Sequence, residues 1–192
     1  MKQKRSMTTK ILAYSALFAA MAIVFGRLTV VYLPPDAKYT LDKFVLFLSG
    51  MLFGPVLGAI IGFVADFLGG LLFGIGFTPQ LCVPAILFGL FGGLAQKFLK
   101  KKFSLVRLFF AYLFPTVIGA IIWQSAALAW TFNAANFWVS LKYYLLTRSI
   151  QFTIMLVLET ILIHILINTN IFTRMGLWPA KKQKKEENEN DC

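Results

Sequence analysis

The stretch GMLFGPVLGAIIGFVADFLG, residues 50–69, decides the fold class of this chain. It lies inside an apolar run from Phe44 to Phe77, which is too long for one membrane-spanning helix of about 20 residues. Gly54-Pro55 is the position at which this run divides, because proline disrupts a helix that began before it. The sequence therefore predicts two consecutive helices. The first, residues 41–53, is short for a full crossing and is expected to be tilted or partly re-entrant.

The overall composition points to the same class of protein. The chain has 192 residues, of which 58% are hydrophobic and 14% are charged. A soluble domain of this size cannot hide that much apolar surface, so a polytopic membrane protein is expected. The net charge of +11 could suggest nucleic acid as a partner. However, the cations are confined to the two ends and one loop, which argues against a nucleic-acid-binding face.

Four further apolar segments are long enough to cross a bilayer, which gives six helices in total. They are residues 11–33, 81–96, 108–132 and 139–167. Fourteen of the 19 Lys and Arg residues fall in the segments that this count places on one side: 1–10, 97–107 and 174–192. By the positive-inside rule, both termini are cytoplasmic.

The expected fold is thus an all-α, six-transmembrane-helix bundle without a soluble domain. Residues 1–10 form a basic cytoplasmic N-terminus, residues 11–170 the transmembrane substrate-binding domain, and residues 171–192 a charged cytoplasmic tail. The two cysteines, Cys82 and Cys192, provide no disulfide framework. The lipid bilayer is the expected surroundings of the whole middle domain.

Polar and aromatic side chains gather on the extracellular side of this topology. The candidate substrate-binding residues there are Lys38, Tyr39, Gln80, Trp123, Gln124, Trp130, Asn133, Arg148 and Gln151. Aromatic faces stack a flat ring, amides satisfy its donors and acceptors, and arginine binds carboxylates. Arg148 is the strongest candidate, because a charge inside a span usually faces a cavity or the protein interior. The alternative for the aromatic residues is an ordinary belt at the membrane interface.

Three further ionisable residues lie within the predicted spans. Asp66 needs a partner or a water-lined pocket, so it either contacts ligand or ties two helices together. Glu159 is about 16 Å deeper than Arg148 at 1.5 Å per residue, which favours an internal tie or a partner contact. His164 is the only histidine and forms no metal site. No phosphate-binding loop, zinc-protease or serine-hydrolase motif occurs, so we expect no catalytic residues, no metal and no cofactor.

Small residues recur at helical spacing along three of the predicted helices. In lipid, such stripes let helix backbones approach closely, and the glycines of residues 58–69 and 89–93 are expected to build the bundle itself. Ala13, Ala16 and Ala20 form a similar stripe on the first helix. That stripe either packs inside the bundle or faces outward toward a partner helix.

Taken together, these segments resemble the substrate-binding S components of energy-coupling factor (ECF) vitamin transporters. The matching stretches are SALFAAMAIV, LSGMLFGPVLGAIIGFVADFLGGLLF, PAILFGLFGGL and RSIQFTIMLVLETIL, and the resemblance covers residues 8–170. The stretch at residues 50–69 is the most specific of these. It is most similar to the folate members of the family, which share the Gly-Pro break and Ala-Asp-x-x-Gly.

The resemblance implies a function and a set of partners. The alanine stripe would dock against the coupling helices of a transmembrane T component, which two cytoplasmic ATPases drive. The chain would bind folate near the outer face, under a lid formed by the first outer loop, and release it inside by toppling in the membrane. ATP hydrolysis would belong to the partners, so this chain is not an enzyme.

The identity of the vitamin stays open at this point. The segment DAKYTLDKFV, residues 36–45, is more charged than the apolar run that the family has there. Pantothenate, hydroxymethylpyrimidine and a thiamine-like compound are alternative ligands. A structural membrane protein without a ligand and an intramembrane enzyme are the alternatives from other classes.

Overall fold

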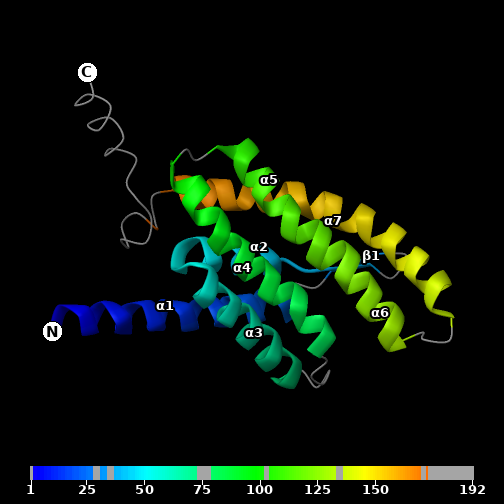
Figure 1. Cartoon of the computed structure of the whole chain (residues 1–192), viewed down its shortest axis with the longest axis horizontal. Coiled ribbons are helices and arrows are strands. Elements are labelled where there is room, and N and C mark those ends of the chain that lie inside the picture. Colours follow the sequence, from blue (N-terminus) through cyan, green and yellow to red (C-terminus); the bar gives the residue numbers. More distant parts are fainter. Residues whose placement is uncertain are drawn as a thin grey trace.

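The chain folds into a bundle of long helices with one short β-hairpin (Figure 1). The computed structural model describes residues 2–27, 31–33, 37–72, 79–101, 104–132, 136–169 and 172. The elements in chain order are α1 (Lys2–Arg27), β1 (Val31–Leu33), β2 (Ala37–Tyr39), α2 (Asp42–Phe53), α3 (Pro55–Leu72), α4 (Pro79–Lys101), α5 (Leu105–Pro115), the π-helix η1 (Thr116–Trp123), α6 (Gln124–Phe132) and α7 (Phe137–Asn168).

Among the residues that the structure describes, five helical segments are long and apolar enough to cross a membrane. They are Thr9–Arg27, Pro55–Leu72, Pro79–Gln96, Leu105–Thr131 and Phe137–Asn168. Helix α2, with 12 residues, is shorter than the roughly 20 residues that a perpendicular crossing needs. The helical, multi-pass architecture is confirmed, whereas the count of six crossings stays a prediction.

The break between α2 and α3 falls at Gly54-Pro55, as the sequence predicts. Gly54 has φ 99°, a conformation that costs a residue with a Cβ atom but not glycine. Its N–H donates to the carbonyl of Gly50 and closes α2. Pro55 is the first residue of α3, where its missing N–H loses no helical hydrogen bond.

Glycines allow α2, α3 and α4 to pack backbone against backbone. A Cβ atom built on Gly89 of α4 would lie 2.0 Å from the carbonyl oxygen of Gly58 in α3. One built on Gly50 of α2 would lie 2.0 Å from the carbonyl oxygen of Gly89. No real side chain fits at such distances, so the three helices meet only because these positions are glycine. The interpretation that the glycine stripes build the bundle is confirmed.

The first outer connection contains a hairpin that the sequence analysis did not predict. Strands β1 and β2 pair antiparallel, with Val31 opposite Tyr39 and Leu33 opposite Ala37. Helix α1 ends at Arg27 instead of continuing to Leu33. The β-branched run before Pro34-Pro35 favours extended backbone, and proline disfavours helix in the residue before it, which accounts for the difference.

The fifth predicted helix also departs from a simple α-helix. The sequence predicts one helix over residues 108–132, but η1 interposes eight residues with π-helical hydrogen bonds between α5 and α6. This wider segment begins directly after Pro115, which lacks the N–H that an α-helix would use there. The helix therefore continues, but with a shifted angular register.

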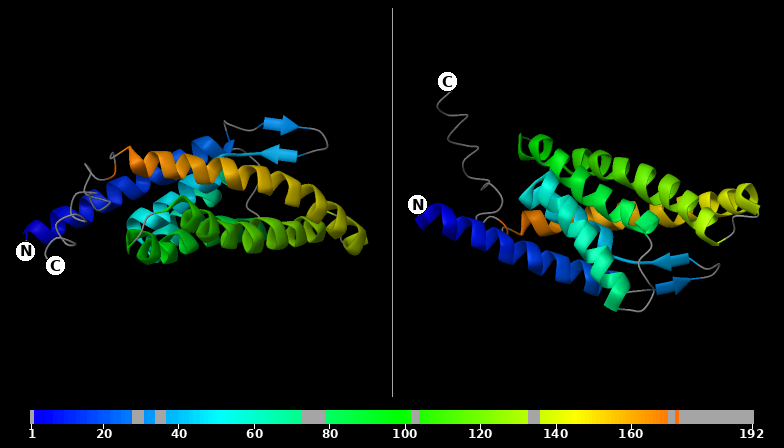
Figure 2. Two further views of the ribbon diagram at one scale, coloured as in Figure 1. Left: turned by 90° about the horizontal axis from the view of Figure 1, so that it is seen from above. Right: turned by 60° about the horizontal axis from the view of Figure 1, so that its bottom comes forward.

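Different elements lie at the two ends of the bundle (Figure 2). Strands β1 and β2, the end of α6 and the start of α7 lie toward one end, and the start of α1 and the last turns of α7 lie toward the other. The first turns of α1 extend beyond the remaining helices (Figure 1). These two ends correspond to the outer and inner sides of the predicted topology.

Candidate functional site

The N-terminal half of α7 places an aromatic ring near two cations. The Nζ atom of Lys43 lies 5.3 Å from the centroid of the Phe152 ring. The guanidinium carbon of Arg148 lies 5.8 Å from the same centroid. Both distances fall within the range of cation–π attraction, which the low-dielectric surroundings strengthen. Phe152 itself is buried, so the ring fixes both cations from inside the bundle.

Lys43 is held in place at the start of α2. Its ammonium forms an ion pair with Asp42 at 3.4 Å and donates to the hydroxyl of Thr40 at 3.5 Å. The side chain of Lys43 is only 12% exposed. The group of Lys43, Arg148 and Asp42 thus has two positive charges and one negative charge, which leaves it one positive charge in excess. Such a group favours an anionic ligand.

Strand β2 and helix α2 both pack against α7. Tyr39, the last residue of β2, is half-buried there. Gln151, next to Phe152, is buried and faces the interior. The hairpin, α2 and α7 therefore bring the predicted residues Tyr39, Arg148 and Gln151 to one region of the bundle.

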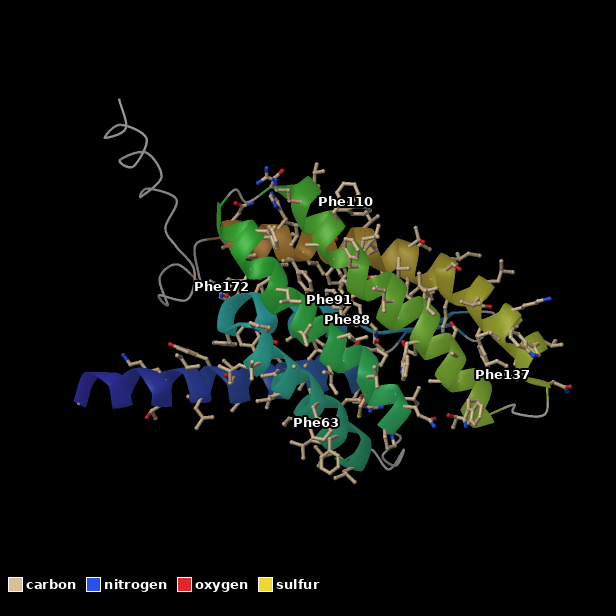
Figure 3. All side chains as sticks on the ribbon, in the orientation of Figure 1. Phe63, Phe88, Phe91, Phe110, Phe137 and Phe172 are labelled. Carbon is tan, nitrogen blue, oxygen red and sulfur yellow. The ribbon has the colours of Figure 1, made fainter. Side chains whose placement is uncertain are left out.

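A buried polar pair lies deeper in the interior. The hydroxyl of Tyr112 in α5 donates a hydrogen bond to a carboxyl oxygen of Glu159 in α7. The Tyr112 ring packs edge-to-face on Phe47 and against Phe88, which Figure 3 shows in the middle of the bundle. Glu159 is therefore an internal tie between two helices, one of the two roles that the sequence analysis favoured.

A second polar group joins α4 to η1 and α6. The indole N–H of Trp123 donates to the backbone carbonyl of Gln80 at 2.9 Å. The hydroxyl of Thr131 donates to the side-chain oxygen of Gln80 at 3.1 Å. Trp123 is 45% exposed and Trp130 is 66% exposed. These aromatic residues therefore lie on the outside of the bundle, as residues of an interface belt do.

The remaining predicted residues are Asp66, Gln124, Asn133 and Lys38. Asp66 in α3 accepts a hydrogen bond from the Cys82 thiol of α4 at 2.8 Å, so it ties two helices together. Gln124 lies at the start of α6, and its side-chain oxygen is buried. Asn133 and the side chain of Lys38 lie outside the described residues.

Sequence reasoning did not select Lys43 and Phe152 as site residues. A usable signal was present, because Lys43 belongs to the unusually charged segment before α2. Phe152 gave no signal, since it is one of 20 phenylalanines. Only the packing of α2 against α7 distinguishes it from the others.

The three alanines of α1 lie on its exposed face. Ala13, Ala16 and Ala20 are exposed, together with Leu17 and Met21. The other face of α1 buries Phe18, Ala19 and Ala22 against the bundle. Within the described chain the alanine stripe therefore packs on no other helix, and a smooth surface remains for contacts outside the chain.

These features define a multi-pass helical membrane protein in which two half-buried cations lie against a buried aromatic ring of α7. The sequence model of the family "ECF-type riboflavin transporter, S component" matches residues 6–168. The chain belongs to this family of transporter substrate-binding subunits, and the resemblance recognised in the sequence is confirmed.

Solved structures give a second comparison. Seven chains of solved structures match, among them one described as "Crystal structure of FolT bound with folic acid". That chain has 29% sequence identity and a TM-score of 0.68, and the match covers 82% of this chain and 92% of that one. The fold is thus FolT-like. No curated protein sequence matches the chain.

Proposed function

We propose that this chain is the folate-binding S component of an ECF-type importer. The observation that carries the proposal is the match to FolT bound with folic acid over most of both chains. The two interior cations at Phe152 support it, because they supply the charge that a dicarboxylate vitamin requires.

The chemistry of folate suits this arrangement. Folate has a flat pteridine ring at one end and two glutamate carboxylates at the other. The fork of Arg148 binds a carboxylate through two hydrogen bonds, and Lys43 adds a second positive charge. Because both groups are sheltered from water, each contact is stronger than on an exposed surface. Tyr39 on β2 lies at the edge of this region, where a hairpin covers the bound vitamin.

Delivery of the vitamin needs partners that hydrolyse ATP. The exposed stripe of Ala13, Ala16 and Ala20 docks on a T component, to which two ATPase subunits are attached. The smooth face suits close helix packing, because at these positions only methyl groups separate the backbones. The chain crosses the membrane with both termini in the cytoplasm, and it releases folate inward by toppling when docked.

Riboflavin is the second candidate ligand, because the matching family carries its name. Its isoalloxazine ring is a fused pteridine, so it presents a similar flat, polar surface. It has an uncharged ribityl chain where folate has carboxylates. The excess positive charge at Phe152 therefore favours folate over riboflavin.

The test is calorimetric titration of the purified full-length chain in mild detergent. Folate and riboflavin are titrated separately, with pantothenate and thiamine as further ligands. We expect folate to bind most tightly and riboflavin to bind weakly or not at all. If riboflavin binds more tightly than folate, riboflavin is the cargo instead. Failure of all four ligands to bind would overturn the proposed function.

A further inference from the structure

Ser125 of α6 holds a buried hydroxyl that has no hydrogen-bond partner among the described residues. The residue is fully buried. Nine other Ser and Thr hydroxyls in the described chain donate to a backbone carbonyl three or four residues earlier. Because a buried polar group without a partner costs free energy, an exception at this position requires an explanation.

The π-helix provides the local cause. The carbonyl four residues before Ser125 belongs to Ile121, inside η1, where the hydrogen-bonding pattern differs from that of an α-helix. The amide N–H of Gln124 donates to the carbonyls of both Gly119 and Ile121. The backbone around the usual acceptor of the Ser125 hydroxyl therefore departs from α-helical geometry.

The same wide segment directs Ser125 into the bundle. Five of the buried positions along this helix, Tyr112, Thr116, Ala120, Ser125 and Ala129, are spaced by four residues, except for one step of five across the end of η1. Pro115, Gly119 and Ala127, beside this row, are buried as well. Without the wider turn, Gln124 would continue this inward face. The side-chain oxygen of Gln124 is also buried without a partner in the described chain, so two adjacent polar groups lack partners here.

Ser125 lies at the depth of Arg148. The hydrogen bond between Tyr112 and Glu159 fixes the relative heights of the two antiparallel helical segments, which run side by side in Figures 1 and 2. Ser125 is 13 residues from Tyr112 along the first segment, and Arg148 is 11 residues from Glu159 along the second, in the same direction. At 1.5 Å per residue these distances are about 19 and about 16 Å. The two side chains are therefore at nearly the same level of the outer half.

We infer that Ser125 is a specificity-determining residue that hydrogen-bonds the polar edge of the pteridine ring, with Gln124 beside it. The inference rests on the proposed function and adds a second contact region to it, opposite the cations. Arg148 and Lys43 bind the carboxylate end of the ligand, and Ser125 binds the ring. Ala120 of η1 and Ala129 of α6 are small and buried, and they leave this face of the helix smooth enough for a flat ring to lie against it.

The test is the variant Ser125→Ala, for which we measure ligand affinity and the melting temperature of the ligand-free protein. Affinity for folate is expected to fall about tenfold, because a ring donor or acceptor loses its partner. Pteroate, which has the same ring without glutamate, is expected to lose affinity by the same factor. The melting temperature of the ligand-free protein is expected to stay the same or rise, since an unsatisfied buried hydroxyl is removed. Ser125→Thr keeps the hydroxyl and retains more affinity.

Ser49→Ala is the matched control. Ser49 is equally buried, but its hydroxyl donates to the carbonyl of Leu46, so its removal is expected to leave folate affinity unchanged. Unchanged folate binding by Ser125→Ala, a loss for folate but not for pteroate, or a lower melting temperature without ligand would each overturn the inference. If the wild-type chain binds neither folate nor riboflavin, the proposed function fails instead. If it binds riboflavin, lumiflavin takes the place of pteroate.

Discussion

The hydroxyl of Tyr112 donates to the carboxyl group of Glu159 and joins α5 to α7 in the interior of the bundle. Both residues are almost completely buried, at 1% and 2% exposure. The second carboxyl oxygen of Glu159 has no partner among the described residues. The pair is thus a single tie between two helices, and the loss of Tyr112 leaves the carboxyl group with neither oxygen bonded.

Tyr112→Phe is therefore expected to lower the free energy of unfolding by about 1–2 kcal/mol. The change keeps the ring contacts with Phe47 and Phe88, so the loss reports the hydrogen bond alone. Thermal unfolding in detergent measures it. The double variant with Glu159→Leu is expected to lose less than the sum of the two single variants, because both remove the same interaction. Strictly additive losses would show that the two side chains are not coupled.

Arg148→Gln is expected to weaken folate binding about 10- to 100-fold, because a charge-assisted contact with a carboxylate is lost. Pteroate, which has one benzoate carboxylate in place of the two glutamate carboxylates, is expected to lose less. Arg148→Lys keeps the charge but not the forked guanidinium group. Its affinity for folate is therefore expected to lie between those of the wild type and Arg148→Gln. Calorimetry on the purified variants gives all three values. Equal losses for folate and pteroate would remove Arg148 from the carboxylate end of the ligand.

Ala16→Trp or Ala20→Trp is expected to abolish vitamin uptake by cells that contain the whole transporter, while the purified variant binds ligand normally. The large ring prevents close packing of a partner helix on α1. Leu146→Trp is the control, because Leu146 is exposed on α7, away from the alanine stripe. Normal uptake by both alanine variants would show that this face is not a docking surface.

Gly89→Ala is expected to lower the free energy of unfolding by about 3 kcal/mol, because its methyl group would meet the backbone of α3 at 2.0 Å. Gly119→Ala is the matched control. A methyl group there meets the flexible end of Leu87 at 3.4 Å, and it removes a helical glycine, so the change is expected to be neutral or stabilising. Melting temperatures compare the two. Similar values for both variants would contradict the close packing of α3 and α4.

Local sequence features predicted much of the fold. The division at Gly54-Pro55, the glycine stripes and the helical segments follow from residues close together in the chain. The candidate site was predicted in part, since Arg148 is a charge within a span and therefore conspicuous. The hairpin and the π-helix were not predicted, because both depend on competition between local propensity and packing.

What the sequence by itself determined is the membrane class, the positions of the helices and the small residues on their faces. Only the tertiary structure decided that Phe152 lies near both Lys43 and Arg148, that Tyr112 meets Glu159, and that the alanines of α1 face outward. The physical reason is the surrounding lipid. A helix that is apolar on every side has no polar face to mark its outside, so its rotation and partners are set by packing with other helices.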